Sequence, residues 1–352
     1  MAVFNGKNLK IEIYGESHAD KIGANVKGFP NFTFNLDRLN EFLSRRKASK
    51  SVFSTSRKED DIPVFTNVEN YTISGDFSVD IYNNNTKSGD YDNLYAKPRP
   101  SHADYSAFLK DGTLNFKGGG RFSGRLTAPL CIVGGLCKQY LESIGIFVEA
   151  YVSRIGNVCG KSYKNESICL DSLIKLRENE FPSLSNKEEM LNLISQAKKD
   201  SDSVGGVIEC IVYNMKGGVG DNLFEGLEGK ISSLVYSVPA VKGVEFGLGF
   251  DISKMFGSQA NDQLSYIDNK VEFLTNNCGG INGGISNGAQ ITLSVAVKPT
   301  PSIYKKQKTI DIINKCNTEI EIVGRHDSCI VPRAVPCVES AVAIALLDEI
   351  MW

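Results

Sequence analysis

Alternating apolar and polar residues predict short strands in the first 85 residues of the chain. Residues 9–14 read LKIEIY, which has the period of two that is typical of a half-buried strand. Residues 71–85 predict a meander of strands, with turns at Ser74-Gly75 and at 83–85. Between these stretches, Asn35 or Asp37 can cap a helix whose apolar residues share one face, namely Leu36, Leu39, Phe42 and Leu43. The polar residues 49–61 predict a loop before the next apolar residues.

The rest of the chain alternates apolar strands with helices. Strands are expected at 146–155, 204–215, 238–246 and 289–297, and residues 255–276 are expected to form a polar excursion. One helix is expected from Thr127, a plausible N-cap, to Gly145. Others are expected at 185–199, where Ser185 and Glu188 form a capping box, at 221–236 and at 338–350. Antiparallel meanders with helices after turns indicate an α+β layered domain rather than strict βαβ alternation.

Composition excludes several classes of protein. The 352 residues are 41% hydrophobic and 23% charged with a formal net charge of −2, so there is no basic excess that would favour nucleic acid. The N-terminal residues lack the pattern of a signal peptide, and the most apolar run, 128–144, is too short and interrupted for a membrane span. The nine cysteines include no CxxC pair, and Cys and His do not gather at zinc-site spacing. We therefore expect no metal, no membrane contact, and a cytoplasmic protein with reduced, mostly buried thiols.

Residues 118–128, GGGRFSGRLTA, combine three features that favour a bound anion. Three successive glycines let the backbone turn sharply and approach a ligand closely. Arg121 and Arg125 carry guanidinium groups, which can bind phosphate or carboxylate through two parallel hydrogen bonds. The apolar run after Thr127 places a helix N-terminus at the same point. A tight turn into a buried helix would explain the glycines but not the two arginines.

This stretch lacks the residues that a nucleotide-binding loop requires. Gly119 and Gly124 have the spacing of GxxxxGK[ST], but Arg125 stands where the lysine belongs and Leu126 where the magnesium-binding hydroxyl belongs. No GxGxxG pattern occurs in the chain, so a Rossmann site for NAD is unsupported.

Two further arginines are candidate anion clamps. Arg325 lies in a polar turn near the C-terminus, and Arg46 lies in the run Arg45-Arg46-Lys47 that closes the helix predicted after Asn35. Cations there would compensate the helix dipole, and they would equally suit an anionic substrate. The sequence leaves both interpretations open.

The three histidines of the chain lie in polar, loop-like segments. They are His18, His102 and His326. Imidazole can donate a proton to a leaving phosphate because its ordinary pKa is close to the operating pH. Together with the arginines, these residues predict an enzyme that acts on a small polyanion, with a bound cofactor as an additional possibility.

Six motifs, in order along almost the whole chain, resemble those of the chorismate synthase family. They are GESH at 15–18, RPSHADY at 99–105, GGGRFSGR at 118–125, GGINGGIS at 279–286, KPTPS at 298–302 and GRHD at 324–327. All three histidines fall inside these motifs. The resemblance implies a single domain over residues 1–352, a β-α-β sandwich in which helices are enclosed between antiparallel sheets, and a homotetramer.

The resemblance also implies an activity. Members of the family are lyases that convert 5-enolpyruvylshikimate 3-phosphate to chorismate, the last step of the shikimate pathway in aromatic amino-acid biosynthesis. Phosphate and the C6 pro-R hydrogen leave in a trans-1,4-elimination that requires reduced FMN but has no net redox change. The sequence does not decide whether the protein reduces its own flavin with NADPH or depends on an external flavin reductase.

Roles for individual residues follow from the resemblance by matched position. His18 is expected to donate a proton to the leaving phosphate, His102 to protonate the reduced flavin, and Asp327 to be the carboxylate near flavin N5. Arg46 and Arg125 are expected to face the phosphate or carboxylates of the substrate. Contacts to FMN are expected from Arg121, Phe122, Ser123, Pro239, Ala240, Gly283, Lys298, Pro299, Thr300, Pro301, Ser302 and Arg325.

The chain departs from the usual family pattern at positions close to the expected anion site. Ala19 replaces a glycine, Val52 stands where an arginine is often found, and Phe122 and Gly124 lie in a segment that is often RSSAR. Lys47 or Lys50 is an alternative source of the charge missing at position 52.

Two other functions remain possible alongside the enzyme. One is a flavin- or phosphometabolite-binding homologue without catalysis, which the retention of His18, His102 and Asp327 argues against. The other is an ordinary flavin oxidoreductase, which would consume reduced flavin with each turnover.

Overall fold

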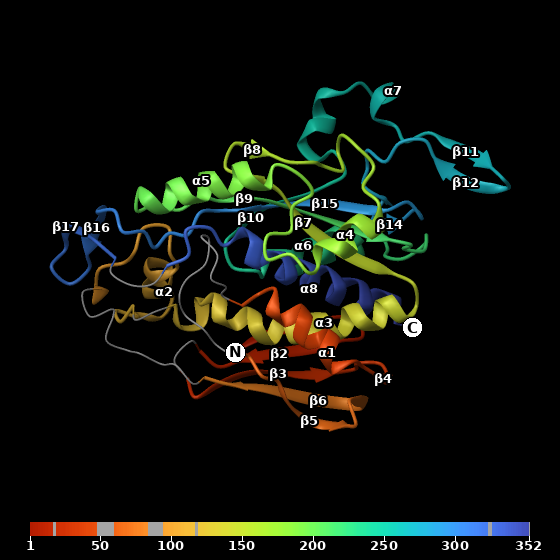
Figure 1. The fold of residues 1–352 in the computed structure, drawn as a ribbon. Coiled ribbons are helices and arrows are strands. Elements are labelled where there is room, and N and C mark those ends of the chain that lie inside the picture. The colour runs from red at the N-terminus through yellow and green to blue at the C-terminus, as the bar shows by residue number, and fades with distance from the viewer. Residues whose placement is uncertain (17–18, 48–59, 84–93, 117–118, 323–325, 352) are drawn as a thin grey trace.

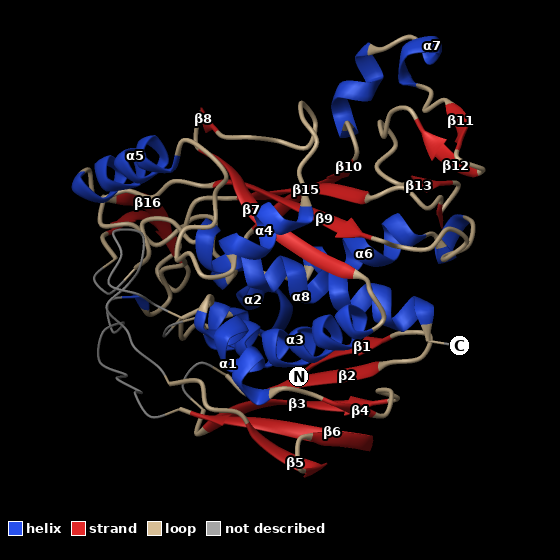
Figure 2. Cartoon of the chain, turned by 45° about the vertical axis from the view of Figure 1, so that its right-hand side comes forward, coloured by secondary structure: helices blue, strands red, loops and turns tan. Residues whose placement is uncertain are grey.

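Two antiparallel sheets enclose a layer of helices, as Figures 1 and 2 show. The computed structural model describes residues 1–16, 19–47, 60–83, 94–116, 119–322 and 326–351. The arrangement confirms the predicted α+β fold with helices between the sheets.

The first sheet contains the strands of the N-terminal meander. Its order is β1 (Ala2–Asn5), β2 (Lys10–Tyr14), β3 (Lys21–Lys27), β6 (Thr72–Tyr82) and β4 (Phe32–Thr33), with β5 (Val64–Glu69) also paired to β6. Along β6 the side chains of Phe77, Val79 and Ile81 are buried, and those between them are more exposed. This alternation buries one face of the sheet against the helices and leaves the other open to solvent.

The second sheet is covered on both faces. Its order is β10 (Val241–Phe246), β15 (Ile291–Val297), β9 (Gly206–Tyr213), β7 (Phe147–Ile155) and β8 (Val158–Cys159). The outer face packs against α4 (Leu170–Leu176) and α5 (Lys187–Lys199). Because both faces are covered, β9 and β15 are buried almost continuously rather than alternately.

The helical layer consists of α1 (Leu36–Ser44), α3 (Thr127–Ser143), α6 (Leu227–Tyr236) and α8 (Val331–Ile350). Helix α8 is central to it, since all its residues except Arg333 and Ile350 are buried. It crosses α3 at close range, because a Cβ atom added to Gly134 would lie 2.1 Å from Cβ of Ser340. Asp348 at the end of α8 accepts hydrogen bonds from the backbone N–H groups of residues 7, 8 and 9, which ties the helix to the first sheet.

The remaining elements are short. They are α2 (Asp104–Asp111), α7 (Gly257–Ala260), the 3₁₀ segments η2 (Gly120–Phe122), η3 (Gly124–Leu126), η4 (Leu223–Glu225) and η5 (Gly249–Lys254), and the hairpins β11–β12 (Leu264–Ile267, Lys270–Phe273), β13–β14 (Ile281–Asn282, Ile285–Ser286) and β16–β17 (Gln307–Asp311, Cys316–Ile320). The hairpin β11–β12 occupies part of the stretch predicted as a polar excursion. None of the described helices has the length and hydropathy needed to cross a membrane.

Details of the helix ends differ from prediction. Thr127 is the first residue of α3 rather than its cap, and its hydroxyl donates to the carbonyl of Gly124. The predicted capping box is wrong, because the cap of α5 is Asn186, while the hydroxyl of Ser185 accepts from the backbone N–H of Lys161. Helix α8 begins at 331 rather than 338 and contains Pro336, although proline ordinarily disrupts a helix interior; burial on all sides stabilises this helix.

Candidate active site

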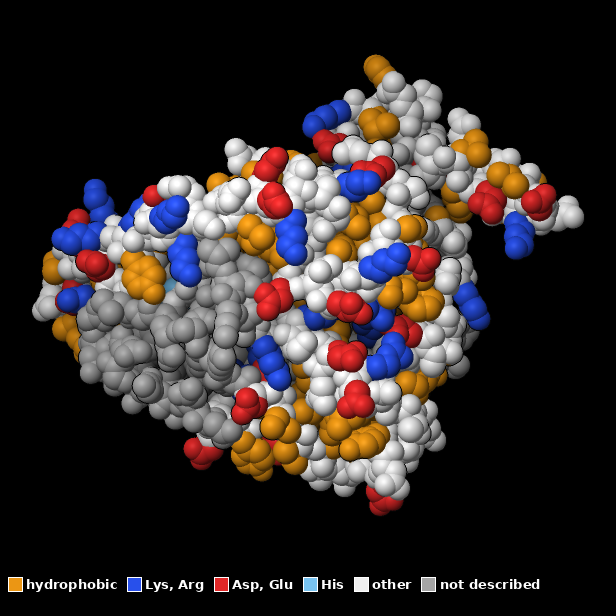
Figure 3. Space-filling view, in the orientation of Figure 1, with side chains coloured by type: hydrophobic (Ala, Val, Ile, Leu, Met, Phe, Trp, Pro, Cys, Tyr) orange, Lys and Arg blue, Asp and Glu red, His pale blue; other side chains and the backbone are white. Residues whose placement is uncertain are grey.

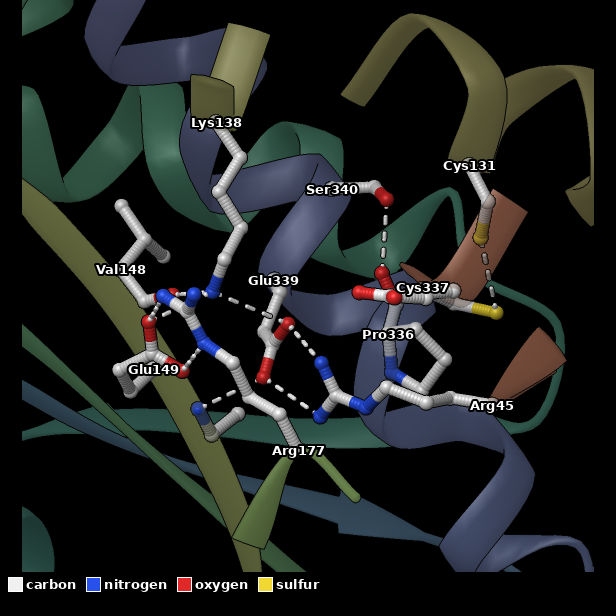
Figure 4. A network of polar contacts seen from close by, with 12 residues as sticks. Arg45, Cys131, Lys138, Val148, Glu149, Arg177, Pro336, Cys337, Glu339 and Ser340 are labelled. Atoms are coloured by element: carbon white, nitrogen blue, oxygen red, sulfur yellow. Dashed lines mark hydrogen bonds and ion pairs between the residues drawn. The ribbon is translucent and has the colours of Figure 1, made fainter. Parts of the chain in front are cut away.

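Arg45 and Arg46, adjacent at the end of α1, have different partners. Arg45 makes a two-pronged contact with Glu339 of α8, at 2.8 and 2.9 Å. Figure 4 shows that Glu339 and Glu149 then share Lys138 in a buried network that joins α1, α3, α8 and β7. Arg45 therefore does not serve as a substrate clamp, since its guanidinium group belongs to the ion network of the core.

Arg46 meets Arg125 at a single carboxylate. Asp61 contacts Nη2 of Arg46 through Oδ2 and Nη1 of Arg125 through Oδ1. All three side chains are at most 8% exposed. Burial raises the pKa of Asp61, but the two guanidinium charges outweigh it, so the pKa lies below its ordinary value. The two arginines predicted to bind substrate therefore form one buried cluster.

Each of the two arginines also donates a hydrogen bond to a neutral side-chain oxygen. Nη1 of Arg46 lies 3.3 Å from the hydroxyl of Thr127, at the start of α3. Nε of Arg125 donates to Oδ1 of Asn83 at 3.1 Å, and Nδ2 of Asn83 donates to the carbonyl of Ala19 at 2.6 Å. The first motif is thus connected to the arginine cluster through the residue that follows His18.

His102 is held by a carboxylate from the first turn of α2. Its Nδ1 lies 2.5 Å from Oδ1 of Asp104, and Arg99 grips the same carboxylate through Nε at 2.7 Å and Nη2 at 2.8 Å. Burial raises the pKa of Asp104, but hydrogen bonds from Arg99 and His102 outweigh it and lower the pKa to about 2. An ionised Asp104 fixes the His102 tautomer with its proton on Nδ1, which leaves Nε2 for a ligand.

The last motif lies beside the arginine cluster. Asp327 accepts from Nη1 of Arg333 at 2.6 Å, and Nε of Arg333 donates to the backbone carbonyl of Arg46 at 2.9 Å. The neighbouring His326 packs beside Tyr304, with ring centroids 5.6 Å apart. Burial, with the positive charge of Arg99, lowers the pKa of His326 to about 4, so its imidazole is neutral at neutral pH.

Most of the residues predicted to contact FMN lie close to the arginine cluster or to His102. Arg121 pairs with Asp111 at the end of α2 and lies 5.0 Å from the ring centroid of Phe122. The hydroxyl of Ser123 accepts from the backbone N–H of Arg125 at 3.1 Å.

The segment that follows β15 lies beside His102. The Nζ atom of Lys298 donates to the carbonyl of Ser101, beside His102. The backbone N–H of Lys298 donates to the carbonyl of Ala240 at 2.9 Å, which brings Pro239 and Ala240 alongside the 298–302 segment.

Three predicted site residues are not placed beside the arginine cluster or His102. Gly283 lies in the turn between β13 and β14, next to the start of α6. Gly283 and Lys298 lie near opposite ends of β15. This strand has seven residues and is therefore roughly 20 Å long. His18 and Arg325 lie outside the described residues.

Several buried polar atoms in the site have no hydrogen-bond partner among the described residues. They are Nε of Arg46, Oγ1 of Thr300 and Nε2 of His326. Unpaired buried polar groups are costly in proteins, so these three atoms are candidates for contact with a polar ligand. The described part of the chain contains no cluster of three or more potential metal ligands.

Sequence reasoning did not identify Asp61, Asp104 or Arg333 as site residues. Asp104 lies in the motif RPSHADY, two residues after His102. This spacing could have indicated a carboxylate that orients the histidine. Asp61 stands beside another aspartate in a polar loop, and nothing in the sequence separates the buried carboxylate from the exposed Asp60. Arg333 lies six residues beyond Asp327 and outside the six motifs, so the sequence gives no signal for it.

A sandwich with paired arginines and an oriented histidine at one end defines an enzyme site for a small anionic substrate. The family model described as Chorismate synthase matches residues 9–351. Chorismate synthase of Methanococcus aeolicus is 43% identical over 357 residues, covering 97% of this chain and 95% of that protein. Chorismate synthase of Dehalococcoides mccartyi strain BAV1 is 40% identical over 347 residues, with the same coverage.

A solved structure agrees with these relatives. The crystal structure of a chorismate synthase aligns with a TM-score of 0.73 and 26% identity, covering 98% of this chain and 92% of that one. The chain belongs to the chorismate synthase family.

Proposed function

We propose that this protein catalyses the trans-1,4-elimination of phosphate from 5-enolpyruvylshikimate 3-phosphate, giving chorismate. The observation that carries the proposal is that Asp61 joins Arg46 to Arg125 in one buried cluster, to which Arg333 connects Asp327, although these residues are far apart in sequence. Asp104 and Arg99 hold His102 in a second cluster, and the charge of Arg99 acts on His326, the neighbour of Asp327. Membership of the chorismate synthase family supports the same reaction.

The arginines bind the charged groups of the substrate. Arg46 and Arg125 present two guanidinium groups from a buried, water-poor position, where a hydrogen bond to an anion is stronger than at the surface. A departing phosphate gains negative charge as its bond to carbon breaks, so fixed cations favour the transition state over the bound substrate.

His102 moves a proton through Nε2. Asp104 holds Nδ1–H, so that the ring cannot rotate or exchange tautomers without breaking a short contact. We assign His102 as the proton partner of the reduced flavin, His18 as the proton donor to the leaving phosphate, and Asp327, held by Arg333, as the carboxylate near the flavin.

The residues present fit FMN. Phe122 offers a half-exposed aromatic ring beside the Arg121 guanidinium, and Thr300 has a buried hydroxyl without a described partner. Reduced FMN, when bound, supplies electron density to the departing phosphate and recovers it afterwards. We propose that Arg121, Phe122, Ser123, Pro239, Ala240 and Lys298 to Ser302 form the FMN site, with Arg325 and Gly283 added by resemblance.

The test is phosphate release from the enolpyruvyl substrate with chemically reduced FMN in the absence of oxygen. Release well above that of the His102→Ala variant is expected. Phosphate release no faster than that of the His102→Ala variant would contradict the proposal and favour a non-catalytic binding homologue. Net oxidation of flavin in step with turnover would instead favour an oxidoreductase.

We also propose a homotetramer. The segment 248–275 projects from one corner of the molecule (Figure 3) and exposes large apolar side chains, namely Phe250, Phe256, Leu264, Tyr266, Val271 and Leu274. Apolar side chains gathered on a projection are typical of a surface that another subunit covers. Light scattering after size-exclusion chromatography checks this, and a monomer would contradict it.

The reductant and the compartment are proposals from the resemblance alone. We place the protein in the cytoplasm and leave two sources of reduced FMN, NADPH used by the protein itself or an external flavin reductase. Turnover by the isolated protein with NADPH and FMN in air would establish the first source.

A further inference from the structure

We propose that Asp61 is a positioning residue that holds Arg46 and Arg125 together as one anion clamp. This inference rests on the proposed function and adds a residue to it. Asp61 belongs to none of the motifs that carry the resemblance, and its role follows from its contacts.

The two oxygens of one carboxylate serve two different arginines. Oδ1 contacts Arg125, from the turn before α3, and Oδ2 contacts Arg46, from the end of α1. Two guanidinium groups repel each other when they are buried side by side, and a carboxylate between them offsets that repulsion. Asp61 therefore determines the separation of the two cations.

The contacts of Asp61 use only part of the hydrogen-bonding capacity of the Arg46 guanidinium. Each guanidinium group has five N–H donors, and Asp61 uses one nitrogen of each group. Thr127 and Asn83 accept from another nitrogen of each arginine, so every head group is held at two points. Nε of Arg46 is buried with no acceptor among the described residues. Asp61 and the two arginines together carry a net charge of +1.

The backbone of Asp61 differs from that of its neighbour. Its φ is +48°, in the left-handed region that aspartate adopts more readily than most residues other than glycine. The neighbour Asp60 is exposed and has no arginine contact in the described residues, so it provides a matched control for the buried carboxylate.

The first test compares Asp61→Asn with the matched control Asp60→Asn. The Michaelis constant for 5-enolpyruvylshikimate 3-phosphate is expected to rise about tenfold or more in Asp61→Asn, because small displacements of binding groups have large effects. The dissociation constant for FMN should change by less than about twofold. Asp61 contacts Arg125, which is assigned to the substrate, and reaches the flavin residue Ser123 only through Arg125. Asp60→Asn should match wild type in both measurements.

A second variant keeps the proposal testable if Asp61→Asn does not fold. Asp61→Glu preserves the charge but moves the carboxylate by one methylene, so the protein should fold while the Michaelis constant still rises several-fold. A role limited to charge neutralisation would leave Asp61→Glu at the wild-type value and would overturn the proposal. An equal loss of FMN affinity in both variants would also overturn it, because the whole site would then have collapsed.

Inorganic phosphate provides a probe that needs no turnover. Calorimetric titration should show weaker phosphate binding to Asp61→Asn than to wild type. Tighter binding would mean that Asp61 occupies the place of the substrate anion, which contradicts a positioning role. A wild-type protein that binds phosphate but releases none from substrate contradicts the proposed function, whereas an active wild type with an unaffected Asp61→Asn contradicts only this inference.

Discussion

Nδ1 of His102 lies 2.5 Å from Oδ1 of Asp104, a carboxylate that Arg99 grips from its other side. Because the pKa of Asp104 is lowered to about 2, the carboxylate is ionised at every pH at which the enzyme would work. The imidazole is therefore fixed in orientation and in tautomer before any ligand binds.

Replacing Asp104 by asparagine should lower kcat about 10²-fold, at the lower end of what a positioned proton donor contributes. An amide can present its N–H to Nδ1 and so favour the wrong tautomer, while Arg99 and the fold of α2 are retained. Steady-state kinetics with reduced FMN measure the effect, and Asp171→Asn in the exposed first turn of α4 is the control. A kcat within twofold of wild type would show that the orientation of His102 does not matter.

Replacing Arg125 by alanine should weaken substrate binding more than it disturbs folding. Arg46 remains to pair with Asp61, so the buried carboxylate is not left alone. Loss of a charge-assisted contact corresponds to about 1.5–3 kcal/mol in substrate affinity. The Michaelis constant and the melting temperature are measured together, with Arg38→Ala at the exposed side of α1 as the control. Unchanged affinity with a lowered melting temperature would make Arg125 a structural residue.

Replacing Glu339 by glutamine should destabilise the protein in a pH-dependent way. Burial raises the pKa of Glu339, but the charges of Arg45 and Lys138 outweigh it, so the folded-state pKa lies below the ordinary 4.5. A lowered pKa contributes stability that is present above the unfolded pKa and is lost as the pH falls toward the folded pKa. Near pH 7 the loss should be about 3–5 kcal/mol, because Arg45 and Lys138 stay buried without their partner.

The difference in free energy of unfolding between wild type and Glu339→Gln should therefore shrink below about pH 4.5. Urea unfolding at a series of pH values measures it, with Glu41→Gln on the exposed face of α1 as the control. A difference that stays constant down to pH 3 would show that the ion network contributes no charge-dependent stability.

Replacing Gly134 by alanine should separate α3 from α8. The added Cβ would lie 2.1 Å from Cβ and 2.4 Å from Cα of Ser340, and the backbone atom cannot move aside without shifting α8. Overpacking of this kind costs about 1–3 kcal/mol or more. Thermal unfolding should show a lower melting temperature, whereas Gly229→Ala in α6, where no atom lies within 4 Å of the added Cβ, should be neutral or slightly stabilising. Equal melting temperatures for the two variants would contradict the close α3–α8 contact.

Much of the fold could be predicted from the sequence because its helices and strands have strong periodicity. The strand at 10–14, the helix ended by Gly145 and the strands at 206–213 and 291–297 lie where the pattern of apolar residues places them. Strands β1 and β3, helices α2 and α4 and the hairpin β16–β17 were not predicted, since they are short or lack a clear period. The N-cap of α1 was narrowed to two residues, and the structure selects Asn35, whose side chain accepts from the N–H of Arg38.

The chemistry available to this protein can be recognised from its amino-acid sequence: arginines in glycine-rich turns, three histidines in polar loops, and six motifs in the order of the chorismate synthase family. Side-chain type and local spacing are local properties, so they can be seen without a fold. The partners of each cation depend on the three-dimensional fold. Arg45 and Arg46 are adjacent and chemically identical, yet Arg45 pairs with Glu339 inside the helical layer while Arg46 joins Arg125 at Asp61. That choice depends on α8 and on the turn before α3, which are distant in sequence and reach α1 only when the two sheets close around the helices.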